Sequence, residues 1–240
     1  MDLGIAGRAA LVTGASQGLG FASALALAAD GAEVAITGRD TGRLAAAAGR
    51  IDAETGRKAL TIPGDITDPA EPGRAVRATV ERFGRLDIVV PNAGGPPPKR
   101  ALDVTGEDIG AAVNANLTSM VRLIQAARPH LRESGDGRIC AITSFSVLQP
   151  IPSLSLSNLA RAGLWGWAKT AAQELVPEGI TLNLICPGRH NTERLASLGF
   201  EGRAGDPVDF GKVVAFLCSA PARFITATTI VVDGGEMLGL

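Results

Sequence analysis

The residues with the clearest chemical potential stand in a glycine-rich turn near the start of the chain. Gly14-Ala-Ser-Gln-Gly18-Leu-Gly20 follows a short apolar run from Arg8 to Thr13 and precedes an Ala/Leu-rich stretch that reaches about Asp30. A strand, a glycine turn and a helix in this order form a nucleotide site. The reason is that backbone N–H groups at a helix N-terminus point at phosphate, and the helix dipole favours negative charge. The sequence therefore predicts a phosphate-binding turn.

The elements that must position this turn alternate along the whole chain. Candidate strands cover 9–13, 33–37, 59–63, 86–90, 138–143, 181–186 and 228–232, and candidate helices cover 18–30, 40–54, 69–83, 105–132, 155–176 and 207–219. The strands are apolar without alternation, as expected when helices cover both faces of a parallel sheet. The pattern predicts an α/β fold, a doubly wound (Rossmann-type) parallel sheet of about seven strands with helices on both faces. No linker or repeat divides the chain, so we expect a single domain over 1–240.

Ligands bind such a sheet outside the carboxyl ends of its strands. Small and polar residues follow one candidate strand after another, namely Gly38-Arg39, Asp65-Ile66, Asn92-Ala93-Gly94, Ser144 and Pro187-Gly188. We expect these residues to gather at one edge of the sheet beside the glycine turn.

Composition excludes several other classes of function. A net charge of −1 and a pI near 6.1 give no electrostatic case for a nucleic-acid or membrane partner. No run of 18 apolar residues is present, and the N-terminus does not resemble a secretory signal. The three cysteines, Cys140, Cys186 and Cys218, match neither a metal site nor a disulfide framework. We therefore expect a cytoplasmic protein without a metal.

Taken together, these motifs resemble the short-chain dehydrogenase/reductase family over essentially the whole chain. The spacing Thr13-Gly14-x-x-x-Gly18-x-Gly20 is typical of that family, and Asp65, Asn92-Ala93-Gly94, Asn116, Ser144 and Pro187-Gly188 follow in the family's order. NANLTSMVRL, RICAITS and TATTIVVDGG are most similar to the branch of 3-oxoacyl-carrier-protein reductases. The resemblance implies hydride transfer between a nicotinamide cofactor and a carbonyl/alcohol pair on a small-molecule or carrier-linked substrate.

The resemblance also implies which residues hold the cofactor. Six residues of the turn would surround its phosphates, namely Gly14, Ser16, Gln17, Gly18, Leu19 and Gly20. Asp65 and Ile66 would contact the adenine. Asn92, Ala93 and Gly94 would line the ribose. Pro187, Gly188 and Thr192 would contact the nicotinamide amide.

Arg39 bears on the choice between NADP and NAD. A carboxylate at the end of the second strand would bind a ribose 2′-OH, whereas arginine accommodates a 2′-phosphate. Gly38 stands where an NAD enzyme usually has aspartate, and Arg39 follows it. We therefore expect NADP in preference to NAD; the alternative is that Arg39 only opens an exposed helix beside Asp40.

The chain departs from the family at its catalytic pair, because it contains no tyrosine. The family's Tyr-x-x-x-Lys pair aligns with Ser157 and Arg161, whose i, i+4 spacing still places both on one helix face. A serine hydroxyl is a much weaker acid than a tyrosine, and arginine does not release its proton. The predicted catalytic residues are therefore Ser144, Ser157, Arg161 and Asn116, an atypical centre.

Several roles around this centre stay open. Arg161 would clamp a developing oxyanion or a substrate carboxylate, or else bind the nicotinamide ribose; Asn116 would hold a water relay or kink its helix. We expect His190 to be a solvent-facing loop histidine in preference to a replacement acid. The segment 189–205 is short and carries four arginine or histidine side chains, so it predicts an open mouth rimmed by cations or a solvated loop.

Three functions fit these observations. The first is an NADP-dependent oxidoreductase of the short-chain type. The alternatives are a non-catalytic, cofactor-binding partner subunit and a redox-neutral enzyme of the cyclase or lyase type. The resemblance also implies a homo-oligomer, a tetramer or dimer paired through helices 105–132 and 155–176. Trp165 and Trp167 would add apolar surface to the second of these helices, unless both pack inside one chain.

Overall fold

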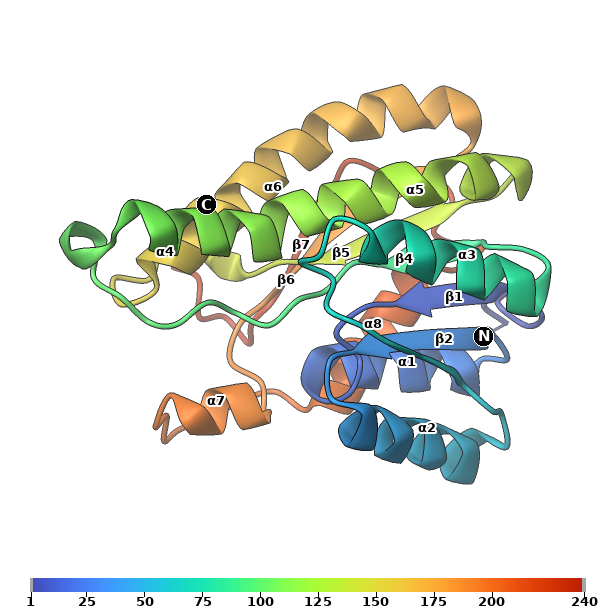
Figure 1. Ribbon diagram of the computed structural model, residues 1–240, viewed down its shortest axis with the longest axis horizontal. Coiled ribbons are helices and arrows are strands. Elements are labelled where there is room, and N and C mark those ends of the chain that lie inside the picture. Colours follow the sequence, from blue (N-terminus) through green and yellow to red (C-terminus); the bar gives the residue numbers. More distant parts are fainter. Residues whose placement is uncertain (1, 239–240) are drawn as a thin grey trace.

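A computed structural model describes residues 2–238 of the chain (Figure 1). Seven strands form one sheet in the order β3-β2-β1-β4-β5-β6-β7, and every neighbouring pair is parallel. The strands are β1 (Ala9–Val12), β2 (Glu33–Gly38), β3 (Leu60–Pro63), β4 (Ile88–Val90), β5 (Arg138–Ile142), β6 (Thr181–Pro187) and β7 (Thr229–Val232). This confirms the predicted fold class. The strand order reverses between β1 and β4, and such a switch point is where ligands bind in open α/β sheets.

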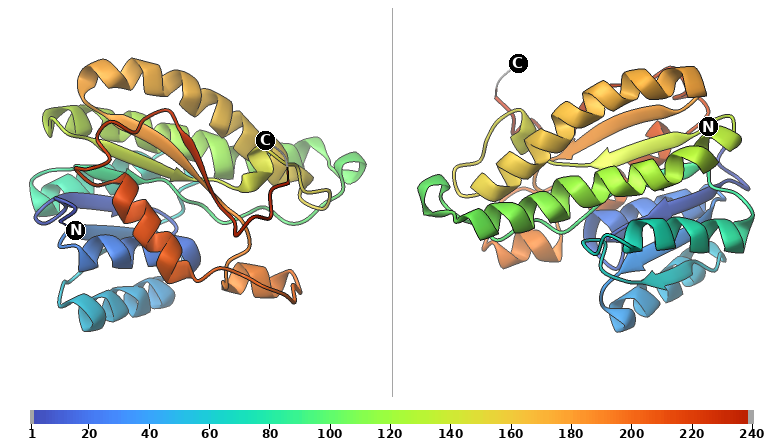
Figure 2. Two further views of the ribbon diagram at one scale, coloured as in Figure 1. Left: turned by 180° about the vertical axis from the view of Figure 1, so that it is seen from behind. Right: turned by 45° about the horizontal axis from the view of Figure 1, so that its top comes forward.

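Helices cover both faces of the sheet (Figures 1 and 2). They are α1 (Gly18–Ala29), α2 (Thr41–Thr55), α3 (Glu71–Phe83), α4 (Gly106–Val113), α5 (Ser119–Glu133), α6 (Ser155–Leu175), α7 (Glu193–Ser197) and α8 (Pro207–Leu217). Helices α1, α2 and α8 pack on one face, and α3, α5 and α6 pack on the other. No helix in the described part of the chain is long and apolar enough to cross a membrane.

Each face of the sheet has its own apolar core. On β1, Ala10 and Val12 point into the core shared with α1, α2 and α8, whereas Leu11 points into the core shared with α3, α5 and α6. Successive strand residues face opposite sides of a sheet, so a strand buried on both faces must be apolar at every position. Residues 9–12 are accordingly all buried, which explains the continuous apolar run in the sequence.

Two segments differ from the sequence-based expectation. The stretch 105–132 is not one uniform α-helix, because a π-helical turn at Asn114–Thr118 separates α4 from α5. Helix α7 lies in the segment 189–205, where we expected no helix. It begins after Thr192, whose side chain accepts a hydrogen bond from the backbone N–H of Leu195 at 3.3 Å. Both differences lie next to the predicted ligand edge of the sheet.

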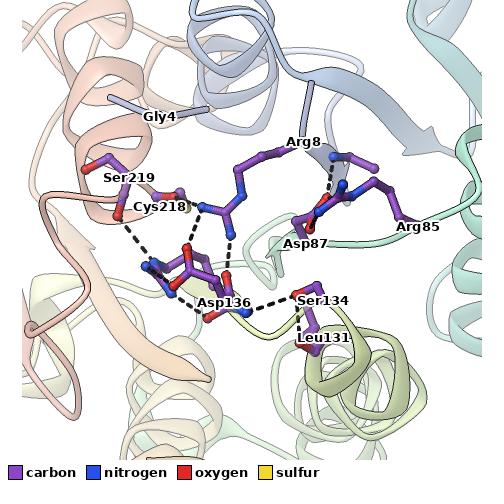
Figure 3. Close-up of polar contacts among 12 residues, drawn as sticks. Gly4, Arg8, Arg85, Asp87, Leu131, Ser134, Asp136, Cys218 and Ser219 are labelled. Atoms are coloured by element: carbon purple, nitrogen blue, oxygen red, sulfur yellow. Dashed lines mark hydrogen bonds and ion pairs between the residues drawn. The ribbon is translucent and has the colours of Figure 1, made fainter. Parts of the chain in front are cut away.

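Two buried arginines hold the opposite edge of the sheet together (Figure 3). Arg138 Nη2 lies 2.6 Å from Asp136 Oδ1, and its Nε donates to the carbonyl of Ser219 at 3.3 Å. Arg8 Nη1 lies 3.4 Å from Asp136 Oδ2 and donates to the carbonyl of Cys218 at 3.5 Å. Burial lowers the pKa of Arg8, and Asp136 partly offsets this effect. These contacts join the end of α8 to the first residues of β1 and β5.

Candidate functional site

The glycine turn after β1 has a backbone that other residues rarely adopt. Gly14 and Gly18 have φ values of +57° and +60°, in the left-handed region that favours glycine. A Cβ atom added to Gly20 would lie 2.5 Å from the carbonyl oxygen of Gly14 and 2.6 Å from Asn92 Nδ2. Glycine at these three positions therefore lets the turn pack tightly against both its own strand and the loop after β4.

Asn92 fixes this loop to the turn. Its Nδ2 donates to the carbonyls of Thr13 and Gly14 at 3.2 and 3.0 Å. The hydroxyl of Thr13 accepts from the backbone N–H of Asn92 and donates to its carbonyl, both at 2.8 Å. Residues Thr13, Gly14 and Asn92 thus join the carboxyl ends of β1 and β4 at the switch point of the sheet.

The N-terminus of α1 suits a phosphate group. Gln17 precedes the helix in an extended conformation and provides no side-chain cap, and the first turn of α1 contains no acidic residue. The first N–H groups of a helix have no intrahelical acceptor, so an uncapped N-terminus is a ready anion site. The glycines that bring the backbone close, together with this uncapped end, fit the pyrophosphate of a dinucleotide.

A cavity of about 710 Å³ extends from this helix end across the carboxyl edge of the sheet. Thirteen residues predicted from the sequence line it, namely Gly14, Gln17, Gly18, Leu19, Asn92, Ala93, Gly94, Ser144, Ser157, Arg161, Pro187, Gly188 and Thr192. Six predicted residues do not line it, namely Ser16, Gly20, Arg39, Asp65, Ile66 and Asn116. The structure thus brings most of the predicted site residues around one cavity.

Arg39 and Asp65 lie together outside this cavity, after β2 and β3. Arg39 Nη1 is 3.8 Å from Asp65 Oδ2, and the Arg39 side chain is 79% exposed. Burial raises the pKa of Asp65, but hydrogen bonds from Thr67 and the charge of Arg39 outweigh it, so the net pKa is lowered. Sequence reasoning missed Arg43, whose Nη1 donates to Gln17 Oε1 at 2.7 Å. Its only signal is a second arginine four residues after Arg39.

Arg161 lies buried beneath the cavity. Its Nη1 donates to the carbonyls of Ile142 and Thr143 at 3.2 and 3.0 Å, and its Nη2 donates to the carbonyl of Ala93 at 3.3 Å. No carboxylate among residues 2–238 forms an ion pair with it. Burial, followed by the nearby charge of Arg194, lowers the pKa of Arg161 to about 10. The guanidinium therefore stays protonated at neutral pH.

Two serines face the same cavity. Ser144 is the second residue after β5, and its hydroxyl accepts a hydrogen bond from the backbone N–H of Ser146 at 3.1 Å. Ser157 is 7% exposed and lies one turn before Arg161 on α6. A third serine, Ser153, also lines the cavity and was not predicted. Each hydroxyl can donate one hydrogen bond to a ligand oxygen.

Asn116 lies in the π-helical turn between α4 and α5. It is fully buried, and neither its Nδ2 nor its Oδ1 has a hydrogen-bond partner among residues 2–238. A buried amide without a protein partner normally binds an ordered water. The π turn agrees with a distorted helix at Asn116, and the unpaired amide agrees with a bound water; both alternatives from the sequence therefore have support.

The segment after β6 forms a lid, defined here as residues 189–205. Arg194 Nη2 donates to the carbonyl of Pro96 at 2.7 Å, so the lid contacts the loop after β4. Helix α7 and this bond border one side of the cavity, whose mouth the cations of this segment rim in part. Arg189 and Arg194 line the cavity, but Arg203 does not.

The expectation that His190 faces solvent is wrong. His190 is 6% exposed, its Nδ1 lies 3.2 Å from the carbonyl oxygen of Gly188, and its ring meets the edge of Phe210 at 5.1 Å. Phe210 belongs to α8, so this packing depends on a contact that local sequence does not reveal. His190 anchors the base of the lid.

Comparisons with known proteins agree with this geometry. Residues 14–236 match the family model described as enoyl-(acyl carrier protein) reductase. The chain is 32% identical over 238 residues to a 3-oxoacyl-[acyl-carrier-protein] reductase of Synechocystis sp., covering 95% of this chain and 96% of that protein. It is 34% identical over 263 residues to a cyclohexanol dehydrogenase of Rhodococcus sp., covering 98% and 97%.

Solved structures give the same result. L-sorbose reductase from Gluconobacter frateurii, complexed with NADPH and L-sorbose, superposes with a TM-score of 0.94 at 28% identity, covering all of both chains. A short-chain dehydrogenase from Burkholderia cenocepacia in complex with NADP gives 0.88 at 37% identity, covering 96% of this chain and 98% of that one. The sheet order, the glycine turn locked to Asn92 and these similarities lead to one conclusion: the chain belongs to the short-chain dehydrogenase/reductase family of NAD(P)-dependent oxidoreductases.

Proposed function

We propose that the protein is an NADP(H)-dependent oxidoreductase that interconverts a carbonyl compound and its alcohol at an atypical centre of Ser144, Ser157 and Arg161. The observation that carries this proposal is the single cavity that runs from the uncapped end of α1 to these residues. A bound nicotinamide would supply or accept the hydride. The dinucleotide would be held by the glycine turn, by Asn92-Ala93-Gly94 and by Pro187, Gly188 and Thr192.

The adenosine end supports NADP over NAD. Gly38 leaves the end of β2 without a carboxylate, and Arg39 and Arg43 stand beside the glycine turn. Arginine binds phosphate through a planar fork of donors, so this pair suits a 2′-phosphate. Asp65 and Ile66 would border the adenine. The similar structures from Gluconobacter frateurii and Burkholderia cenocepacia were solved with NADPH and NADP, which agrees with this preference.

The chemistry of the centre would be electrostatic. The hydroxyls of Ser144 and Ser157 would donate hydrogen bonds to the substrate oxygen, and the charge of Arg161 would stabilise negative charge that develops there. A positioned acid typically contributes about 10²–10⁴ to a rate, and neither serine nor arginine is a comparable acid. We therefore propose slow turnover that takes its proton from solvent. The unpaired amide of Asn116 would hold a water behind the centre.

The relatives support two classes of substrate. Similarity to 3-oxoacyl-[acyl-carrier-protein] reductases supports an acyl thioester, and similarity to cyclohexanol dehydrogenase and L-sorbose reductase supports a small alcohol or sugar. A second candidate function is a cofactor-binding subunit without redox activity. Arg161 favours it, because three of its N–H groups already donate to backbone carbonyls and are not free for a substrate.

The test is titration of the protein with NADPH and NADH, followed by nicotinamide fluorescence, and then addition of ketones, small oxo acids and 3-oxoacyl thioesters. Tighter binding of NADPH with substrate-dependent oxidation is the expected result. Tight binding without oxidation would support the non-catalytic role or a redox-neutral enzyme. Failure to bind either dinucleotide would overturn the proposed cofactor site.

A further inference from the structure

The half of the cavity beneath the lid contains two arginines without acidic partners. Arg194 is half-buried and donates through Nη2 to the carbonyl of Pro96. Its guanidinium packs against the loop after β4. A Cβ atom built on Gly95 of that loop would lie 3.2–3.5 Å from Nη2, Nε and Cζ of Arg194. Within residues 2–238, its Nε and Nη1 groups have no hydrogen-bond acceptor. The guanidinium is thus fixed in place while part of its donor fork remains available.

Arg161 adds a second positive charge close by. It is 6% exposed, and within the described chain its Nε has no acceptor. Both arginines line the same cavity, and burial together with the charge of Arg194 lowers the pKa of Arg161. Two like charges on one cavity without a counter-ion favour an anionic occupant.

The other charged residues of the cavity do not neutralise this pair. Arg189 lies 3.7 Å from Glu236 and stacks on Phe200 at 4.4 Å, so its charge is already matched. Glu193 and Glu201 also line the cavity, but both are exposed and neither forms an ion pair in the described structure. The positive field therefore comes from Arg161 and Arg194.

We propose that the substrate is a small oxo acid or hydroxy acid, whose carboxylate binds Arg194 with support from Arg161. This inference rests on the proposed function. The cavity of about 710 Å³ must also hold the nicotinamide half of a dinucleotide, so the substrate is small. A carboxylate is the smallest anionic group common in carbonyl compounds, and it matches the guanidinium fork. Its carbonyl oxygen would then face Ser144 and Ser157.

The overall reaction balances without a further reactant. In the reducing direction, the carbonyl carbon gains a hydride from the reduced nicotinamide, the C=O π pair moves to oxygen, and that oxygen takes a proton from water. The oxo acid becomes a hydroxy acid and NADPH becomes NADP⁺. The carboxylate is unchanged, so its contribution is to bind and orient the substrate.

The experiment compares each acid with its neutral methyl ester. Pyruvate, acetoacetate and levulinate, and the methyl ester of each, are titrated calorimetrically into the protein with and without saturating NADP⁺. At least one acid should bind about tenfold or more tightly than its ester. Arg194→Gln should weaken that acid by about 10- to 100-fold, the range for a charge-assisted hydrogen bond, and should weaken the ester and NADP⁺ much less, because they lose only the lid contact with Pro96. Arg194→Lys should give an intermediate loss.

Arg203→Gln is the matched control, because Arg203 belongs to the same lid but does not line the cavity. Three results would overturn the proposal: acids and esters bind equally or not at all, Arg203→Gln weakens the acid as much as Arg194→Gln, or Arg194→Gln weakens acid and ester alike. The last result would make Arg194 only a lid contact. Failure of NADPH to bind or be oxidised, with acid binding still dependent on Arg194, would instead refute the proposed function alone.

Discussion

Arg161 stands where the family has a lysine, and its side chain is engaged by the surrounding backbone. The resemblance aligns it with a lysine, which has one ammonium group, whereas its guanidinium reaches three carbonyls on two loops. Those carbonyls belong to Ala93, Ile142 and Thr143, at the carboxyl ends of β4 and β5. Arg161 is therefore a positioning residue for the cavity floor as well as a source of charge.

Arg161→Met should destabilise the protein by about 2–4 kcal/mol, because it leaves three buried carbonyls without donors. Arg161→Lys should cost less, since the ammonium can still reach part of this set. Urea unfolding followed by circular dichroism measures both changes. Arg203→Met is the control, and its exposed side chain should change the unfolding free energy by less than about 0.5 kcal/mol. Equal stability of Arg161→Met and Arg203→Met would contradict this account.

Restoring the family pair tests the chemistry at the same positions. The double variant Ser157→Tyr/Arg161→Lys introduces a phenol whose acidity a neighbouring cation can raise. We expect ketone reduction by NADPH to increase by about 10²–10⁴, the usual contribution of a positioned acid. Steady-state rates on the best substrate of the wild-type protein measure the change, with Ser157→Phe/Arg161→Lys as the control for added ring volume. An unchanged rate with normal NADPH binding would show that turnover is not limited by proton transfer.

At the scale of elements, the contact between α1 and the loop after β4 depends on the absence of a side chain at Gly20. Gly20→Ala would place a methyl group 2.5 Å from the carbonyl oxygen of Gly14. We expect a loss of about 1–3 kcal/mol in unfolding free energy, typical of overpacking, and weaker NADPH binding. Gly49→Ala is the matched control, because Gly49 is an exposed residue of α2 with nothing near its Cβ position. It should be neutral or stabilising by up to about 1 kcal/mol.

The start of α4 gives a prediction about pH. Asp108 accepts hydrogen bonds from Lys99 and from the backbone and hydroxyl of Thr105, and these contacts lower its pKa from an ordinary value of 3.8 to about 2. A lowered carboxyl pKa stabilises the folded state above the unfolded value, and this contribution disappears as the pH falls through the folded value. Asp108→Asn should therefore lower the urea midpoint clearly more at pH 6 than at pH 2, where about half of the folded-state carboxyl is already protonated. An equal difference at both values would assign the effect to packing.

Most elements could be predicted because their signals are local. Residues 9–12 are buried on both faces of β1 and read as a continuous apolar run, so the strand was predicted to within a residue. The π turn around Asn116 has no periodic signature of its own, because it is only five residues long and lies between α4 and α5. Helix α7 is only five residues long, and the burial of His190 depends on Phe210 from a distant helix. The sequence could not show either feature.

At the scale of the whole molecule, the outer surface of α5 and α6 supports association with a second copy. A groove of about 150 Å³ lies between these helices and includes Ile124, Trp167 and Ala171. Trp165 is partly satisfied within the chain, because its Nε1 donates to Thr229 Oγ1 at 2.9 Å. Both tryptophans are half-buried and pack against the core of α3, α5 and α6, but among residues 2–238 the indole N–H of Trp167 has no acceptor. The alternative, that both tryptophans pack inside one chain, thus fits Trp165 better than Trp167.

Light scattering after gel filtration tests this association. We expect a mass of two or four chains, and Trp167→Glu should reduce it to the 24.5 kDa of one chain by placing a charge in the groove. Leu198→Glu, at a partly exposed lid residue that does not line this groove, is the control and should leave the mass unchanged. A wild-type mass near 24.5 kDa would exclude the homo-oligomer.

The hydrogen bond from Arg194 to Pro96 joins the lid to the opposite wall of the cavity, and its strength sets how often the two walls separate. A hydrogen bond to a charged group contributes about 1.5–3 kcal/mol, which is a factor on the order of 10 to 100 in favour of the closed arrangement. Ligands that arrive while this bond is intact meet a lid that already contacts the opposite wall. Little of their affinity is spent on closure, whereas their entry and departure wait for the minor, open population.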